Sequence, residues 1–375
     1  MKKIFLIVLF SGIVFFVFSE KPEFKPYGFI KGDMYYAIGG VSSWGKPSLT
    51  CASMATGLDT NAISFTAQHT RIGLTGKSNA GDVSFGGLAE VDFFSVAANA
   101  NAKPRMRLAY AWCRPIKWLE IRAGQQWDIF SPLNPTTNNT NANLWYNGNY
   151  GFRRPQMTLI SNFSYIIDHI IQFSAGEATR EDELSVSQDS LGKVSVGSWL
   201  GQDNLSRIPL IQARYSANYN KNFEVGVSFA YATYGKDRGY NTMGIGIDAN
   251  LMFNKLFALK AEYAYGKNLN NANLFTTGGN GNNSKDVLTN GFWIEATSKP
   301  ATFLNLVLGT GIENVVSAVS NGNPTNNRTL YADLIFPVGE YFSLSFEYQL
   351  LNTKIMGQSK ENIAHLFDVA GKITF

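Results

Sequence analysis

The sequence contains few of the residues that bind metals or form disulfide bonds. Its 375 residues include three histidines and two cysteines. His69, His169 and His365 are far apart, and none has a second histidine or a cysteine at the spacing of a zinc site. Cys51 and Cys113 allow at most one disulfide bond in an oxidising compartment. We therefore expect no metal and no other cofactor.

Charged residues and long apolar runs are also scarce. Charged side chains make up 16% of the chain, and the formal net charge is +4. A net charge this small argues against a nucleic-acid partner. Beyond residue 19 no stretch has the about 18 consecutive apolar residues of a transmembrane helix, which excludes a membrane protein built from helices.

The beginning of the chain has the pattern of a secretory signal peptide. Two lysines precede an apolar run that ends at Phe18 and is too short for a comfortable membrane span. Val17 and Ser19 occupy the positions that a signal peptidase reads. We expect residues 1–19 to be removed on export, which leaves residues 20–375 as one domain.

Aromatic residues, glycines and short alternating segments are abundant. Aromatic residues make up 14% of the chain, and there are 35 glycines. Near the start of the predicted domain, Ile30 and Tyr36 fall on one face of a strand and Lys31 and Asp33 on the other, since residues two apart share a face. Strands with one apolar and one polar face suit a transmembrane β-barrel, because a closed sheet satisfies the whole backbone in lipid.

This alternation continues through sixteen segments. Turns after even-numbered segments are short and loops after odd-numbered segments are long, as in outer-membrane barrels with short periplasmic turns. We predict an all-β protein, a 16-stranded antiparallel transmembrane β-barrel with both termini on the periplasmic side. Cys51 and Cys113 would then lie near opposite ends of the barrel, so free thiols are expected. The predicted strands are 27–36, 64–78, 83–94, 105–112, 118–124, 154–160, 169–176, 209–219, 223–231, 243–253, 256–266, 291–298, 303–312, 329–336, 341–351 and 364–375.

Aromatic residues have two expected roles in this barrel. Phe375 ends an alternating strand, as does the C-terminal aromatic residue that serves as the assembly signal of bacterial outer-membrane proteins; it could also be an ordinary membrane-facing residue. Other aromatic side chains are expected on the outer face, where amphipathic rings form girdles at the membrane interfaces. These outward aromatics are Tyr36, Tyr110, Trp112, Tyr231, Tyr263 and Tyr348.

One segment, 124–156, is too long and too polar for an ordinary connection. It follows the fifth predicted strand, and it places asparagines and threonines between aromatic residues. Loops longer than about 12–15 residues without secondary structure of their own tend to be functional. We expect residues 127–151 to fold inward as the third long loop and to narrow the pore. Trp127, Phe130, Trp145 and Tyr146 would anchor this loop to the wall.

The charges assigned to the lumen divide by sign between the two halves of the chain. The first eight strands contribute Lys31, Arg71, Arg105, Arg107, Arg122, Arg154 and Arg214 against Asp33, Glu90, Asp92 and Glu120. The last eight contribute Lys260 and Lys372 against Glu224, Asp248, Glu262, Glu295, Asp333, Glu347 and Asp368. One wall is therefore expected to be basic and the other acidic.

Five arginines lie on the strands that flank the base of the long loop. Rows of arginine at the narrowest part of a pore select anions electrostatically. We expect them to form the positive side of the constriction, with two carboxylates opposing or bracing them. The alternative is that each arginine only pairs with a neighbouring carboxylate and stiffens the wall. The predicted selectivity residues are Arg71, Arg105, Arg107, Glu120, Arg122, Asp128 and Arg154.

Two short segments imitate nucleotide-binding motifs, and a barrel enzyme is an alternative function. GLTGKS near residue 73 lacks the earlier glycine of a P-loop, and GIGIDA at residue 244 continues an alternating strand, so both are interpreted as strand sequence. An outer-membrane barrel enzyme of the lipase or protease type would need a serine or aspartate beside a histidine at the barrel rim, and no such triad is recognisable. A non-conducting structural barrel is a further alternative.

Several segments resemble the DcaP-like outer-membrane porins of the general porin superfamily. They are HTRIGL, AEVDFF, PRMRLAYAW, and RAGQQWDIFSPLNP continuing into RRPQMTL. The detailed resemblance covers residues 27–160, and only the barrel pattern continues downstream. It implies a trimer in the outer membrane of a Gram-negative bacterium, in contact with lipid and lipopolysaccharide, whose third loop constricts a channel for small anions such as dicarboxylates. The helical extension that precedes the barrel in some members is not expected here.

Overall fold

The computed structural model describes residues 21–39, 41, 61–94, 103–141, 144–178, 185–188, 194–197, 208–234, 240–272, 274, 276, 286–317 and 324–375. The predicted signal peptide and Cys51 lie outside these residues. Cys113 is a free cysteine. Within the described chain, no helix has the length and hydropathy needed to cross a membrane.

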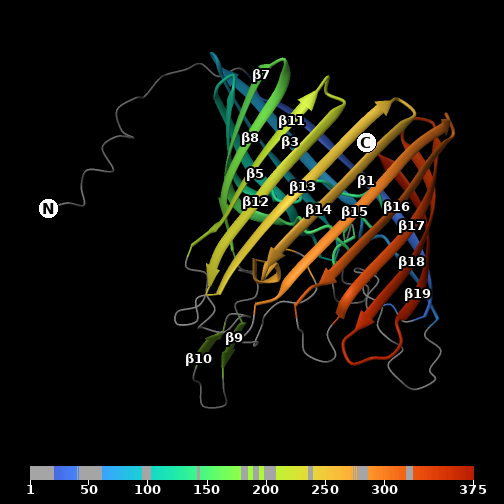
Figure 1. The fold of residues 1–375 in the computed structure, drawn as a ribbon. Coiled ribbons are helices and arrows are strands. Elements are labelled where there is room, and N and C mark those ends of the chain that lie inside the picture. The colour runs from blue at the N-terminus through green and yellow to red at the C-terminus, as the bar shows by residue number, and fades with distance from the viewer. Residues whose placement is uncertain are drawn as a thin grey trace.

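The described chain is a closed antiparallel barrel (Figure 1). Its main sheet has 17 strands. Because β2 and β3 both pair with β1, they share one position in the wall, and the described barrel has sixteen strand positions. The seam closes where β1 pairs with β19. The predicted fold class is therefore confirmed. The strands are β1 (Glu23–Ile38), β2 (Ala62–Thr66), β3 (Arg71–Ala80), β4 (Val83–Asp92), β5 (Arg105–Ile116), β6 (Leu119–Trp127), β7 (Arg153–Tyr165), β8 (Ile167–Gly176), β11 (Leu210–Tyr219), β12 (Phe223–Tyr234), β13 (Tyr240–Asn254), β14 (Phe257–Lys267), β15 (Leu288–Ala301), β16 (Leu304–Val315), β17 (Pro324–Val338), β18 (Phe342–Ile355) and β19 (Asn362–Thr374).

Two small elements complete the described chain. The strands β9 (Ser185–Gln188) and β10 (Val194–Gly197) form a separate two-stranded sheet within the long connection between β8 and β11. A 3-10 helix, η3 (Leu269–Ala272), follows β14. Its Leu269 is buried beside Phe130, at the point where the long segment enters the barrel.

Side chains alternate between a buried inner face and an exposed outer face. On β1, Tyr35 is 1% exposed and its neighbour Tyr36 is 39% exposed. The outer face is apolar, with Ile30, Ile247 and Leu308 among its most exposed residues. A closed sheet with an apolar exterior and a polar interior is the form in which β-strands cross a bilayer.

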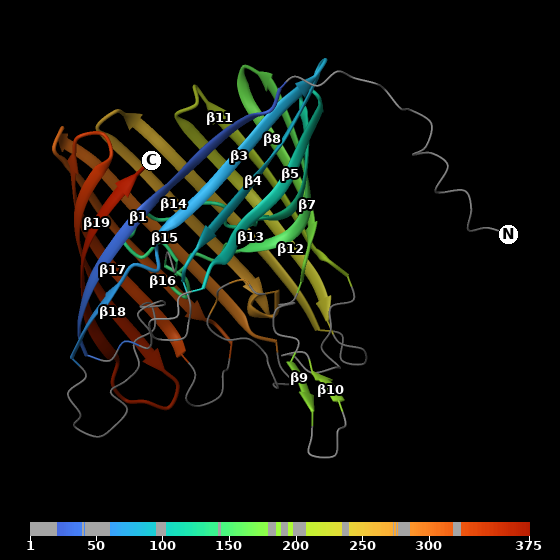
Figure 2. The same cartoon turned by 180° about the vertical axis from the view of Figure 1, so that it is seen from behind.

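The strand β1 begins and β19 ends at the end of the barrel that carries the short turns, such as the one between β3 and β4 (Figures 1 and 2). The turn between β7 and β8 is the single residue Ile166, which has a positive φ of 61°. Asp168 and His169 lie in β8, where the His169 ring stacks on Phe163 and Tyr215. The strand predicted to begin at His169 therefore begins two residues earlier, at Ile167.

The last residue completes the seam between β1 and β19. The amide of Phe375 donates a hydrogen bond to the Gly28 carbonyl, and the Gly28 amide donates one to the Phe375 carbonyl, both at 3.0 Å. The side chain is 50% exposed on the outer face. These contacts make Phe375 a structural end of the wall; its predicted role as an assembly signal stays a prediction.

A register shift in β5 corrects the expected direction of two aromatic side chains. Val91 pairs with Met106, but the preceding Glu90 pairs with Leu108, so one extra residue bulges out of β5. Because a bulge reverses the faces of the residues that follow, Tyr110 and Trp112 point into the lumen. The prediction that they belong to an outer girdle was wrong, since alternation alone carries no signal of a one-residue insertion.

Candidate pore constriction

The long segment begins and ends at one buried ion pair. Asp128 accepts hydrogen bonds from Arg154 Nε and Nη2, at 2.6 and 2.8 Å, and from Gln212 Nε2 at 2.8 Å. Its backbone amide donates to the Phe152 carbonyl at 2.7 Å, and the Phe152 amide donates back to the Asp128 carboxylate at 3.2 Å. The base of the segment 128–152 is therefore held on β6, β7 and β11.

The first half of the segment is bonded to glutamates of the opposite wall. On β14, Glu262 accepts from Ser131 Oγ at 2.6 Å and from the Leu133 amide at 2.7 Å. On β15, Glu295 accepts from the Thr136 amide at 2.5 Å and its hydroxyl at 2.9 Å. Hydrogen bonds within a protein typically stabilise by about 0.5–1.5 kcal/mol each. The segment thus crosses from β6 to the acidic wall, where two carboxylates accept its hydrogen bonds.

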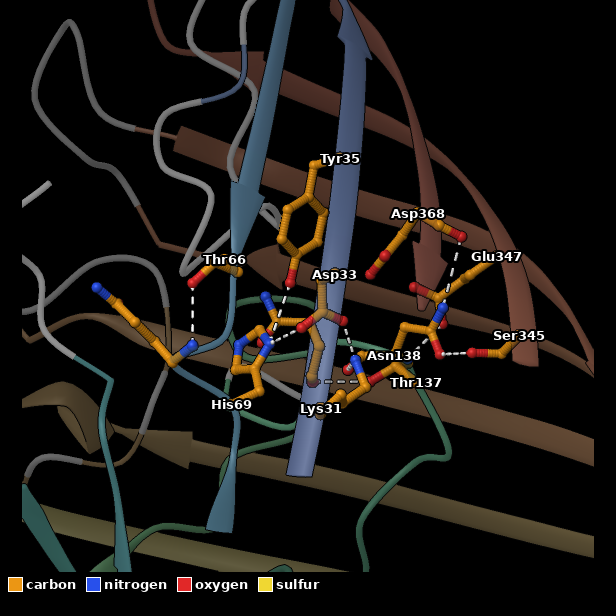
Figure 3. Close-up of polar contacts among 12 residues, drawn as sticks. Lys31, Asp33, Tyr35, Thr66, His69, Thr137, Asn138, Ser345, Glu347 and Asp368 are labelled. Atoms are coloured by element: carbon orange, nitrogen blue, oxygen red, sulfur yellow. Dashed lines mark hydrogen bonds and ion pairs between the residues drawn. The ribbon is translucent and has the colours of Figure 1, made fainter. Parts of the chain in front are cut away.

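Asn138 is the point at which the segment meets β1, β18 and β19 (Figure 3). Its amide donates to Glu347 at 2.8 Å, its side-chain oxygen accepts from Ser345 Oγ at 2.6 Å, and its carbonyl accepts from Lys31 Nζ at 2.8 Å. The Lys31 ammonium is also paired with Asp33. Asn138 therefore fixes the middle of the segment against the seam of the barrel.

Inward glycines allow the second half of the segment to approach the wall closely. A Cβ at Gly311 would overlap the Asn147 carbonyl oxygen, and a Cβ at Gly291 would overlap the Tyr150 hydroxyl. Burial also raises the pKa of the Tyr150 phenol well above its ordinary value. Glycine within a strand often marks such a close approach. On β13 the glycines of the GIGIDA sequence serve this purpose, since a Cβ at Gly244 would lie 3.0 Å from the Phe130 ring.

The four predicted anchor residues lie against different surfaces. Phe130 is fully buried against the wall, and Trp145 packs edge-on against Phe152 with ring centroids 5.6 Å apart. The carbonyl of Tyr146 accepts a hydrogen bond from Asn327 on β17 at 3.0 Å. Trp127, at the end of β6, lies instead beneath the guanidinium of an arginine on β7.

Three of the predicted selectivity arginines gather around two carboxylates. Arg107 donates to Glu90 at 2.8 Å and to Asp92 at 2.9 Å, and its side chain is buried. Arg105 donates to Asp92 at 2.6 Å, and Arg71 Nε lies 3.6 Å from Glu90. The pairing expected under the alternative interpretation is therefore present. Arg105 and Arg71 remain 33% and 20% exposed.

Two of these arginines also contact the segment. Arg105 Nη2 donates to Asn141 Oδ1 at 2.7 Å, and Arg71 Nη2 donates to the Thr140 carbonyl at 3.4 Å. The same stretch that is bound to the acidic wall at Asn138 therefore reaches the basic wall three residues later. The carboxylates of the acidic wall therefore bind the segment on one side, and the arginines lie along its other side.

Arg153 belongs to this group, although alternation did not assign it to the lumen. Its guanidinium lies over the rings of Trp127 and Phe152, at 5.1 and 5.4 Å from their centroids. It is close enough to Arg105 and Arg107 for their charges to repel. Arg153 is 5% exposed, and its Nη1 has no hydrogen-bond partner within the described part of the chain. We call Arg71, Arg105, Arg107 and Arg153 the basic rim.

A second charged cluster lies further along β5 and β6, toward the short turn that joins them. Glu120 accepts from Arg114 Nε at 2.5 Å and is also paired with Arg122. The Arg114 guanidinium lies 5.1 Å from the Trp112 ring centroid, and that of Arg122 lies 5.5 Å from the ring centroid of another inward aromatic residue, Tyr110. The predicted residues Glu120 and Arg122 are therefore separate from the basic rim.

The predicted selectivity set thus occupies three places. Arg71, Arg105 and Arg107 form the basic rim with Arg153, Asp128 and Arg154 brace the base of the segment, and Glu120 and Arg122 lie in the second cluster. Arg153 and Arg114 were missed. Arg153 adjoins Arg154, and neighbours in a strand lie on opposite faces, so alternation assigned only Arg154 to the lumen. Arg114 follows the bulge in β5, which reverses the faces of the residues after it. Neither position carried a signal in the sequence pattern.

Histidines and acidic residues form no metal site in the described chain, where no group of three or more His, Cys, Asp or Glu side chains could hold an ion. The Nδ1 atom of His69 lies 3.1 Å from Asp33 Oδ2 and 3.1 Å from the Tyr35 hydroxyl (Figure 3). His69 is 2% exposed and stacks on Phe94. This buried Asp–His contact joins β1 to the strand position of β2 and β3.

Comparison with known proteins finds solved structures that share this architecture. No protein-family model and no curated protein sequence matches the chain. Among solved structures, the outer membrane channel DcaP of Acinetobacter baumannii superimposes with a TM-score of 0.72 at 17% sequence identity, covering 94% of this chain and 97% of that one. The chain has the fold of the outer-membrane porins.

Other outer-membrane proteins share this fold at lower similarity. The anion-selective porin from Comamonas acidovorans has a TM-score of 0.61 at 11% identity, covering 95% of this chain and all of that one. The trimer form of OmpT, an outer membrane protein of Vibrio cholerae, has a TM-score of 0.58 at 9% identity, with coverages of 95% and 100%. The DcaP structure belongs to the subfamily that the sequence resembles.

Proposed function

We propose that the protein is an outer-membrane channel for the passive diffusion of small hydrophilic anions. The observation that carries this proposal is the path of the segment 128–152. Its hydrogen bonds use the carboxylates of Glu262, Glu295 and Glu347, which places the segment in front of the acidic wall. The basic rim lies at its other edge, so positive charge borders the passage that remains.

The balance of charge at the rim favours anions. Three guanidinium groups contact two carboxylates, Glu90 and Asp92, and a fourth, that of Arg153, lies near them, so the rim carries an excess of positive charge. In a water-filled pore with walls of low dielectric constant, such an excess raises the local concentration of anions and repels cations. Arg105 and Arg71 are the rim residues through which a permeant would meet this charge, because their side chains are partly exposed.

The apolar outer face and the fold support a place in the outer membrane, in contact with lipid and lipopolysaccharide. Export by a signal peptide cleaved after residue 19 belongs to the same proposal. A homotrimer is supported by a trimer form among proteins of this fold. Dicarboxylates are proposed as permeants on the resemblance to the DcaP-like porins, and anion preference is proposed on the likeness in fold to the anion-selective porin from Comamonas acidovorans.

Two other functions follow from specific observations. Because the segment 128–152 crosses the lumen, a barrel that conducts no ions is the first. A hydrolase is the second, since Asp33 and His69 are in contact, although the burial of His69 disfavours access to a substrate.

Single-channel recording and liposome swelling separate these functions. The purified barrel in planar lipid bilayers is expected to give discrete, ion-conducting steps, and in liposomes it should admit small hydrophilic solutes. Lipid and peptide hydrolysis reporters serve as the parallel assay and should remain uncleaved. Absence of both conductance and swelling would overturn the proposal in favour of a structural barrel, whereas cleavage of a reporter without swelling would support a hydrolase.

A further inference from the structure

The second charged cluster has a geometry that the proposed anion rim does not use. Its members are Tyr110, Trp112, Arg114, Arg122 and Glu120, and we call them the aromatic–arginine ladder. In the ladder each guanidinium lies over an aromatic ring, and both arginines share a single carboxylate. Two positive charges and one negative charge leave an excess of one positive charge.

The ladder is built into the wall. Trp112 pairs in register with Arg122, and Tyr110 pairs with Gly124, so all of its side chains stand on the inner face of β5 and β6. The indole of Trp112 lies across β4 at Gly86, where a Cβ would come within 2.7 Å of the ring. Glycine at that position gives the ring room to lie against the sheet, which orients it for stacking.

The arginines retain unused hydrogen-bonding groups on this surface. Each donates to Glu120 through Nε, and among the described residues neither has a partner for its Nη groups. The side chain of Arg114 is 52% exposed and that of Arg122 is 33% exposed. A guanidinium that is already stacked on a ring keeps its edge donors free for a carboxylate and its plane free for a second π system.

We infer that the ladder is a second binding station in the channel, and that it takes planar aromatic monocarboxylates in preference to aliphatic ones. The excess of one positive charge matches one carboxylate, and the alternating rings and guanidinium planes match a flat π system. An aliphatic ring of the same charge and similar size can form the ion pair but cannot stack. This inference rests on the proposed anion channel, because the ligand reaches the ladder through the pore.

The test compares block of the channel current by benzoate and by cyclohexanecarboxylate, which differ chiefly in planarity. In the wild-type protein, benzoate is expected to block at a concentration about two- to thirtyfold lower, since aromatic and cation–π contacts add about 0.5–2 kcal/mol. The double variant Tyr110→Leu and Trp112→Leu should lose this preference. Trp118→Leu, which removes an exposed tryptophan of the short turn, should retain it.

The outcomes distinguish the ladder from the channel itself. An anion-selective reversal potential with equal block by the two carboxylates, or a preference for benzoate that survives in the double variant, would overturn the ladder and leave the channel standing. A channel without anion selectivity would instead overturn the proposed function. Migration of the unheated variants as folded barrels in detergent gels confirms that a lost preference does not come from misfolding.

Discussion

Replacement of Arg71 and Arg105 by Gln is expected to lower the ratio of chloride to potassium permeability about five- to tenfold. These two arginines are the partly exposed members of the basic rim. Without them, two guanidinium groups face two carboxylates and the rim becomes neutral. A unit charge about 7 Å from an ion contributes about 0.6 kcal/mol at the dielectric constant of water and about half of that at about 0.1 M salt. Because it acts with opposite sign on chloride and potassium, two such charges change the free-energy difference between the ions by about 1.2 kcal/mol, which accounts for a change of this size.

Reversal potentials in a potassium chloride gradient measure this ratio. The matched control is Arg328→Gln. Arg328 forms an exposed ion pair with Glu361, and neither residue belongs to the basic rim. Its ratio should equal that of the wild type. If the double variant also keeps the wild-type ratio, the rim arginines only stiffen the wall, and selectivity would have to come from other residues.

Replacement of Glu262 and Glu295 by Leu is expected to raise the single-channel conductance about twofold or more, because pore cross-section governs conductance. These carboxylates accept two hydrogen bonds each from the segment 128–152, on Ser131, Leu133 and Thr136. With leucine in their place these bonds are lost, and segment donors that stay buried each cost about 1–3 kcal/mol. The segment should then leave the far wall, which increases the open area and the current noise.

Glu340→Leu is a control for the change of charge, because Glu340 lies in the exposed turn between β17 and β18. Its conductance should match that of the wild type. Heat-dependent gel migration shows whether the double variant forms a barrel, and lumen substitutions are expected to leave the wall intact. An unchanged conductance in a folded double variant would mean that the segment does not limit the pore.

The barrel could be predicted from sequence because strand alternation is a local signal. Lys31 and Asp33 on β1, or Glu295 on β15, are polar residues set between apolar neighbours, and the pleat alone assigns them to the inner face. The bulge in β5 could not be predicted in this way. Leu108 and Trp112 are apolar and would suit the outer face equally well, so no mismatch marks the extra residue.

The path of the long segment could not be predicted from local sequence patterns either. Asn138 meets Glu347, which is 209 positions away in the chain, and such a contact depends on closure of the whole barrel. A signal was nevertheless present in the inward glycines. Gly244, Gly291 and Gly311 sit at strand positions where side chains usually fill the lumen, and this pattern indicates the approach of another backbone.

The reversal potential of the wild-type channel in a potassium chloride gradient tests the central claim most directly. The claim is that the segment 128–152 covers the acidic wall and leaves the basic rim beside the passage. It predicts a reversal potential toward the equilibrium potential of chloride, with the preference weakening as the salt concentration rises, because salt screens exposed charges. A reversal potential toward that of potassium, or one near zero at low salt, would contradict it.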